Sequence, residues 1–306
     1  MFRPSAQTVR RLALASIVAN AAIVVTGGAV RLTDSGLGCP DWPRCSGASY
    51  TPTAEAAGHA FIEFGNRMLT FVLVAVVAAT LVTVLRHRPR RTTSVRLATV
   101  LVLGIPAQAG LGGITVRTGL NPWTVMGHFL LSMVLIAIAV TLHRRVQEGD
   151  DPVSALAPQP LQRLAQAVLA VVGVTLVVGT VVTGSGPHSG DAQASRTGFD
   201  PATVSQFHAD LVMLLIGLSI ALWVGLRATG APSRAAGILV LVELGQATVG
   251  WTQYFTDLPI ILVGAHLAGA CLVLVAACRT VLSLRARDPA VAAVPAAAPE
   301  SALNSA

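Results

Sequence analysis

Eight long apolar stretches alternate with shorter polar segments along the chain. Each stretch is long enough to cross a bilayer as a helix, which takes about 20 apolar residues. The pattern therefore predicts an all-α polytopic membrane protein with eight transmembrane helices. The first stretch runs straight into the rest of the pattern and is too long for a cleaved signal peptide, so we expect it to remain as a helix. The expected spans are residues 11–30, 61–85, 95–116, 123–142, 161–183, 203–226, 235–255 and 259–283.

The two halves of the chain repeat a spacing of polar and small residues. In each half a Gln-Ala pair precedes a histidine by 20 residues, and a glycine precedes the same histidine by 16. A Val-Thr-Gly sequence, at residues 25–27 and 182–184, ends the first helix of each half in this interpretation. The repeat predicts two tandem four-helix bundles related by a pseudo-two-fold axis along the membrane normal. The repeated residues are Gln108, Gly112 and His128, and then Gln246, Gly250 and His266.

A polar segment, HRRVQEGDDPVSALAPQP, separates the halves. The Ala- and Pro-rich end of the chain is typical of a disordered tail. The expected division is an N-terminal half at 1–143, a cytoplasmic linker at 144–160, a C-terminal half at 161–284 and a disordered tail at 285–306.

Charge sets the expected orientation. The chain is 53% hydrophobic and 11% charged, and all 21 of its basic residues are arginine. Sixteen of them fall on segments on the same side as the N-terminus, which by the positive-inside rule is the cytoplasm. We therefore expect both termini in the cytoplasm and a multi-pass protein of the plasma membrane. Membrane topology explains the net charge of +7 better than nucleic-acid binding does, so we expect contact with lipid and no nucleic-acid partner. A homo-oligomer is compatible with the sequence.

Four histidines follow a proline at nearly constant distance, and each step opens an apolar run. Proline suits the first turn of a helix, and six or seven residues then place each imidazole roughly 10 Å into the helix. One histidine in a membrane helix is often bonded to a neighbouring helix, but four at matched depth favour a functional role. Two facing imidazoles suit six-coordinate haem iron, which predicts one haem site per half. The steps are Pro52 to His59, Pro122 to His128, Pro201 to His208 and Pro259 to His266.

Glu63 follows His59 by four residues and so shares one helix face with it, and Asn66 continues that face. A carboxylate near a macrocycle could orient water, accept a proton or stabilise a developing cation. The alternative is an ion pair with Arg67 or Arg31.

The remaining polar groups support simpler interpretations. Cys39 and Cys45 lie in the first outer loop, where a disulfide, structural or redox-active, is favoured. Cys271 and Cys278 are expected to be small buried thiols. Glu243 is a weaker candidate that pairs with a polar neighbour. The other histidines, His87, His143 and His188, are expected in solvated loops.

Several segments, taken in order, resemble the haem A synthase family. They are GGAVRLTDSGLGCPDWPRC, IEFGNR, GGITVRTGLNPWTVMGH and the regions around His208 and His266. The resemblance covers about residues 12–284. It implies an oxidoreductase that converts haem O to haem A by oxidising the C8 methyl group to a formyl group with oxygen from water. The haem A would supply an aa3-type cytochrome oxidase, with haem O synthase and cytochrome c oxidase assembly as partners.

The resemblance also assigns residues. His208 and His266 would be axial ligands of a resident haem b, and His128 a ligand of the substrate haem O. Glu63 matches a catalytic glutamate, and Cys39 and Cys45 match a cysteine pair found in part of the family.

One position departs from the family pattern, which reads E-x-x-H-R. Here Asn66 takes the histidine's place, between Glu63 and Arg67. Either the substrate haem lacks this ligand or His59 supplies it. The gap from Pro52 matches the other Pro-to-His gaps, so we predict that His59 is the ligand and that Asn66 and Arg67 lie near the substrate.

Two other classes use parts of the same pattern. A non-catalytic b-type cytochrome would use the same histidines but needs neither Glu63 nor room for a farnesylated substrate. A small-solute transporter could share the repeat but would carry charged residues at mid-membrane depth in both halves.

Overall fold

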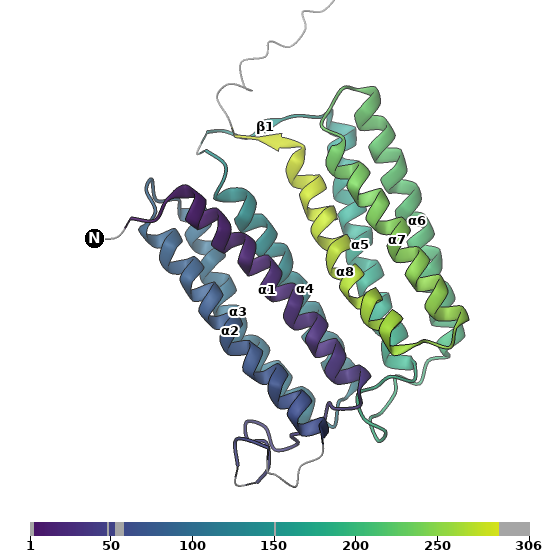
Figure 1. Ribbon diagram of the computed structural model, residues 1–306. Coiled ribbons are helices and arrows are strands. Elements are labelled where there is room, and N and C mark those ends of the chain that lie inside the picture. The colour runs from purple at the N-terminus through teal and green to yellow at the C-terminus, as the bar shows by residue number, and fades with distance from the viewer. Residues whose placement is uncertain (1–2, 48, 53–57, 150, 288–306) are drawn as a thin grey trace, which may run out of the picture.

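The computed structural model describes residues 3–47, 49–52, 58–149 and 151–287. These residues form eight long helices and two short strands (Figure 1). In chain order the elements are α1 (Ala6–Leu32), α2 (Gly58–Arg86), α3 (Thr92–Arg117), α4 (Pro122–Arg145), β1 (Ser154–Ala155), α5 (Gln159–Ser185), α6 (Pro201–Ala228), α7 (Arg234–Phe255), α8 (Ile260–Ser283) and β2 (Arg285–Ala286).

All eight predicted spans are confirmed as helices long and apolar enough to cross a membrane. Most run a few residues past the apolar stretch, because their polar ends continue the helix. Side chains cap three of the starts. Ser5 accepts a hydrogen bond from the backbone N–H of Thr8 at 3.1 Å, Asn121 accepts one from Trp123 at 3.0 Å, and Asp200 accepts one from Thr203 at 2.8 Å. Such caps satisfy donors that the first turn leaves free.

The helices pack as two neighbouring groups of four (Figure 1). In the first group α1 contacts α2 and α4, and α3 contacts the same two helices. In the second group α5 contacts α6 and α8, and α7 contacts those two. Helix α8 also packs against α1 and α4, and α4 against α5, which joins the groups.

Apolar side chains cover the outside of the helices as well as the inside. Ile261 is 83% exposed and Leu241 is 70% exposed, although both belong to spans that could cross a membrane. This apolar surface suits contact with lipid. Between the helices, close packing depends on small residues. At Gly28 of α1 an added Cβ would lie only 2.0 Å from Leu267 of α8, so this glycine permits the contact between the two groups.

The two strands tie the linker to the end of α8. Ser154 pairs with Ala286 and Ala155 with Arg285 in an antiparallel register. The prediction of a disordered tail from residue 285 is therefore wrong for its first residues, which form β2. Residues 288–306 of that predicted tail lie outside the described residues.

A buried carboxylate holds the same junction together. Glu148 accepts hydrogen bonds from Arg144 at 2.8 Å and Arg145 at 2.9 Å, and it lies within 4 Å of Arg285 and Arg287. Burial opposes ionisation of this carboxyl, but the hydrogen bonds from Arg145 and Arg144 outweigh it and lower the pKa of Glu148 below its usual range.

Candidate functional site

His208 of α6 and His266 of α8 face each other inside the second group of helices. Their ring centroids lie 6.5 Å apart, with an angle of 69° between the ring planes. Two imidazoles bound to one metal through bonds of about 2 Å have centroids roughly 6 to 7 Å apart, so the spacing suits a shared metal. Within the described chain, neither buried Nδ1 atom has a hydrogen bond of ordinary geometry. The pair therefore fits the axial ligands of a six-coordinate haem.

A glycine on the neighbouring helix makes room for each imidazole of this pair. A Cβ added at Gly179 would lie 3.0 Å from Cε1 of His208, and one added at Gly250 would lie 3.0 Å from Cε1 of His266. Gln246 also donates a hydrogen bond to the backbone carbonyl of His266 at 2.7 Å. Backbone and side-chain packing together fix where each ring lies.

The first group of helices repeats these contacts around His128 of α4. A Cβ at Gly112 of α3 would lie 3.1 Å from Cε1 of the imidazole. Gln108 donates to the backbone carbonyl of His128 at 3.1 Å and to the hydroxyl of Ser132 at 2.6 Å. The Gln and Gly spacings of the sequence thus correspond to one repeated contact. The Nδ1 atom of His128 is likewise buried, with no hydrogen bond to the described residues.

His59 lies in a different setting. The prediction that Pro52 opens the helix stays a prediction, because residues 53–57 lie outside the described residues and the description of α2 begins at Gly58. His59 is exposed in the first described turn of α2, and its Nδ1 lies 3.0 Å from the hydroxyl oxygen of Ser35. The reason is local: the backbone of His59 packs against Gly38 of the preceding loop, where an added Cβ would clash at 2.6 Å. His59 therefore does not share the depth of the other three histidines.

Asn66 lies deeper along α2, beside a glycine of α1. A Cβ at Gly27 would lie 3.7 Å from Nδ2 of Asn66, and the Thr26 hydroxyl donates to Oδ1 of Asn66 at 2.8 Å. The packing thus makes Gly27 the counterpart of Gly179. The sequence match had paired it with Gly184, which faces Thr197 and Pro122 instead.

Helix ends explain that mismatch. The prediction that Val-Thr-Gly ends the first helix is wrong, since α1 continues past Gly27 to Leu32. In α5 the same three residues lie at the end of the helix, which stops at Ser185. The same Val-Thr-Gly sequence therefore lies at different depths in α1 and α5.

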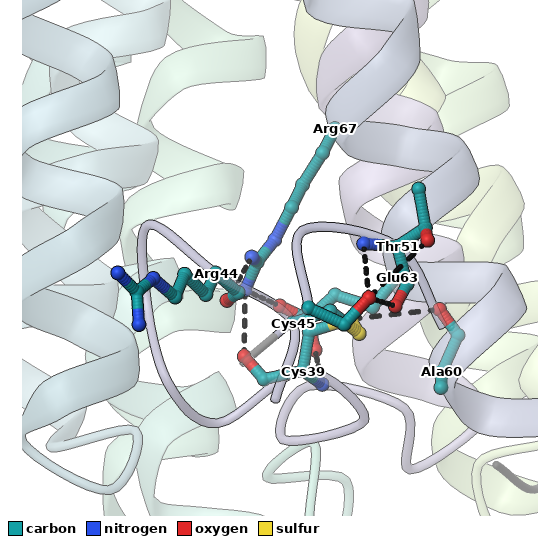
Figure 2. Close-up of a disulfide and its surroundings, with 8 residues drawn as sticks. Cys39, Arg44, Cys45, Thr51, Ala60, Glu63 and Arg67 are labelled. Atoms are coloured by element: carbon teal, nitrogen blue, oxygen red, sulfur yellow. Dashed lines mark hydrogen bonds and ion pairs between the residues drawn. A yellow bond between two sulfur atoms is a disulfide. The ribbon is translucent and has the colours of Figure 1, made fainter. Parts of the chain in front are cut away.

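Glu63 and Arg67 of α2 meet the loop that carries Cys39 and Cys45 (Figure 2). The predicted disulfide between these cysteines is confirmed. Glu63 is 6% exposed, pairs with Arg67 through Oε1, and accepts a hydrogen bond from the Cys39 backbone N–H at 2.7 Å through Oε2. The predicted alternative, an ion pair with Arg67, is therefore present.

Arg67 reaches the same loop through its other donors. Its guanidinium donates to the carbonyl of Cys39 at 2.7 Å and to that of Arg44 at 3.1 Å (Figure 2). The α2 pair thus binds both the N–H and the C=O of Cys39, which holds the disulfide loop against the start of the helix.

Among the other candidates, Glu243 accepts a hydrogen bond from Ser219 at 2.9 Å, as expected of a buried acid with a polar neighbour. Cys271 and Cys278 are buried free thiols, also as expected. The loop prediction for His143 is wrong, because His143 is buried within α4. His188 lies in a loop as expected, half-buried, and its ring nitrogen is 3.0 Å from the Leu258 carbonyl of the loop before α8.

Comparison with known proteins relates this chain to one family. Residues 10–189 match the model of the COX15-CtaA family, described as cytochrome oxidase assembly protein. The relatives include Heme A synthase of Geobacillus kaustophilus, 27% identical over 46% of this chain and 46% of the relative. Heme A synthase of Shewanella oneidensis is 29% identical over 57% of this chain and 55% of the relative. Heme A synthase of Listeria welshimeri is 33% identical, over 42% of each chain. The chain spans about half the length of the curated relatives it matches.

The fold and the buried imidazoles define a multi-pass membrane protein with a histidine pair suited to haem. The family match covers more than half of the 306 residues. The chain belongs to the COX15-CtaA family of cytochrome oxidase assembly proteins, the haem A synthase family indicated by its sequence.

Proposed function

We propose that this protein is a haem A synthase, an oxidoreductase that oxidises the C8 methyl group of haem O to a formyl group with oxygen from water. The observation that carries the proposal is the His208–His266 pair, with centroids 6.5 Å apart and each ring beside its own glycine. Membership in a family with Heme A synthase relatives supports the choice of substrate. The product would supply an aa3-type cytochrome oxidase, with haem O synthase and oxidase assembly as partners.

The two helix groups hold different haems in this proposal. His208 and His266 bind a resident haem b, which supplies electron transfer when bound. His128 binds the iron of the substrate haem O from α4. The second substrate ligand that the sequence predicts, His59, stays a prediction that the contacts of α2 do not favour.

Glu63 is the proposed catalytic residue. The guanidinium of Arg67 and the N–H of Cys39 fix its carboxylate near the start of α2. A fixed carboxylate can stabilise positive charge that develops at the methyl carbon and can orient the water that attacks there. Arg67 then acts as a positioning residue, because its contacts are with Glu63 and the loop.

The proposed topology has both termini in the cytoplasm of a plasma-membrane protein, with the disulfide loop outside. The distribution of arginines and the disulfide between Cys39 and Cys45 support it. The repeated contacts of α3 with α4 and of α7 with α8 support tandem bundles related by a pseudo-two-fold axis. A homo-oligomer is compatible with this arrangement.

The test is extraction and chromatography of haems from the purified full-length protein, expressed with and without haem O synthase. We expect haem B in both cases and haem A only when haem O is supplied. A Glu63→Gln variant should keep haem B and lose haem A, whereas Arg196→Ala, a change in another loop, should keep both. Haem B alone in the unaltered protein would favour the electron-carrying b-type cytochrome, which needs only the histidine pair. No haem at all would overturn both.

A further inference from the structure

We propose that Asn66 occupies the position of a fourth histidine, so that the first helix group offers a bound haem only one axial ligand, His128, and leaves the opposite face of the iron open. The inference rests on the proposed function in assuming that this group binds haem. It concerns residues of this chain, and the spin state of the iron reports on it independently of catalysis.

The position of Asn66 follows from a contact that occurs four times. Each odd-numbered helix carries a glycine that faces one side chain of the next helix. Three of these side chains are imidazoles, approached at 3.0 or 3.1 Å by an added Cβ, and the fourth is the carboxamide of Asn66 at 3.7 Å. The pairs are Gly27 with Asn66, Gly112 with His128, Gly179 with His208 and Gly250 with His266.

Helix packing places Asn66 and His128 on a matching pair of helices. Helices α6 and α8 both contact α5 and α7, and they carry the two histidines that face each other. Helices α2 and α4 both contact α1 and α3 in the same way. Asn66 on α2 and His128 on α4 therefore occupy the same places in the first group as His208 on α6 and His266 on α8 occupy in the second.

A carboxamide cannot replace an imidazole as an iron ligand here. Its nitrogen is a donor of hydrogen bonds and carries no free lone pair. Its oxygen already accepts a hydrogen bond from Thr26 at 2.8 Å. Neutral oxygen donors suit hard cations, whereas imidazole suits iron, so the Asn66 side chain leaves the axial position unfilled.

His59 does not fill that position either. It lies seven residues before Asn66, which is about 10 Å along a helix axis. Its ring is exposed and its Nδ1 is within hydrogen-bond distance of the Ser35 hydroxyl. Reaching the depth of Gly27 would require the first two turns of α2 to move.

Glu63 lies on the side of the iron that has no protein ligand in this proposal. Glu63 precedes Asn66 by three residues and so lies on the same side of α2, one turn nearer its start. The first group therefore places a carboxylate on the side where it lacks an iron ligand. The second group places an iron ligand on both sides, which suits electron transfer without substrate chemistry.

The experiment compares spin states in the full-length protein with both sites loaded with ferric haem, counted by pyridine haemochrome and examined by electron paramagnetic resonance. In the unaltered protein about half of the haem should be low-spin, from the bis-histidine site, and the rest high-spin. Asn66→His should convert nearly all of the high-spin signal to low-spin at the same haem content. Asn66→Gln and His59→Ala should leave the ratio unchanged.

Added imidazole provides a second measurement that no folding defect can mimic. It should bind the open position of the unaltered protein and remove the high-spin signal, and it should have no effect on Asn66→His. Two low-spin haems in the unaltered protein, one of which becomes high-spin in His59→Ala, would overturn the inference and leave the synthase proposal standing. A high-spin site that never yields haem A from haem O would support the inference about Asn66 and overturn the synthase proposal.

Discussion

The two groups of helices use one packing scheme and differ at one position of it. In α5–α8 both glycine-facing side chains are imidazoles, His208 and His266. In α1–α4 one is the imidazole of His128 and the other the carboxamide of Asn66. Close to Asn66, the first group adds an ion pair, Glu63 with Arg67, and a disulfide loop.

In the proposed function, this difference would let a repeated scaffold hold two haem sites of different character. The repeated contacts place each side chain, and one side chain would then decide whether the iron has one or two protein ligands. The polar cluster near the start of α2 has no counterpart in the contacts of α6 among the described residues. Removing parts of each group therefore tests which features belong to the scaffold and which to one site.

Removal of an imidazole should have the largest effect. His208→Ala or His266→Ala should abolish the low-spin haem of the second group, because six-coordination needs both rings. His128→Ala should leave that signal intact and lower only the haem bound by the first group. Haem per polypeptide and the low-spin resonance are the measurements. Equal losses in all three variants would mean that the groups bind haem as one unit.

Crowding the rings should have the next largest effect. Gly250→Ala and Gly112→Ala place a Cβ 3.0 or 3.1 Å from an imidazole, so the ring must shift. Gly27→Ala places one 3.7 Å from Asn66, an ordinary contact. We expect lower haem occupancy or a broadened Soret band in the first two variants and neither change in the third. If Gly27→Ala lowered haem occupancy more than the other two variants, the two groups would not share one packing scheme.

Release of the disulfide loop should have a moderate effect confined to the first group. Arg67→Ala leaves Glu63 buried without its ion-pair partner, which costs about 1 to 3 kcal/mol. The thermal midpoint in detergent should fall, and dithiothreitol should reduce the Cys39–Cys45 bond faster. Arg196→Ala is the matched control, because Arg196 also donates to loop carbonyls but, among the described residues, pairs with no carboxylate. Unchanged reduction kinetics in Arg67→Ala would show that the loop is held by other contacts.

The smallest effect concerns the junction that both groups share. Because the pKa of Glu148 is lowered in the folded protein, its carboxylate stabilises the fold above its unfolded pKa of about 4.3. That stabilisation is lost as the pH falls through the folded-state pKa. Glu148→Gln should therefore lower the thermal midpoint at neutral pH, and the gap from the unaltered protein should close below about pH 4. A gap that stays constant with pH would exclude the ionised carboxylate as its cause.

Hydropathy was sufficient to predict the eight helices, because crossing a bilayer requires only length and apolar character. The repeated Gln and Gly spacings, which predicted a repeat, correspond to real contacts of His128 and His266, since α3 with α4, and α7 with α8, are joined by short turns. Where the intervening segment is short, spacing in sequence reports spacing in the structure.

The same reasoning does not extend to α1 and α2, because the segment that joins them is long. Gly27 and Asn66 are 39 residues apart, whereas Gly112 and His128 are 16 apart. The contacts of Glu63 and Arg67 with Cys39 hold the Cys39 loop against α2, and no local spacing rule captures them. The positions of His59 and Asn66 therefore depend on their tertiary contacts with α1 and the loop after it.

The junction at Glu148 also bears on the order in which the chain is completed. Glu148, Arg144 and Arg145 emerge from the ribosome midway through synthesis, but Arg285 and Arg287 follow only after the last helix. The pairing of β1 with β2 has the same requirement. Since domains fold as they are made, α1–α4 can pack early, whereas the contacts of the linker with Arg285 and Arg287 form last. A released chain truncated before residue 285 should therefore retain both helix groups with the linker still open to proteases.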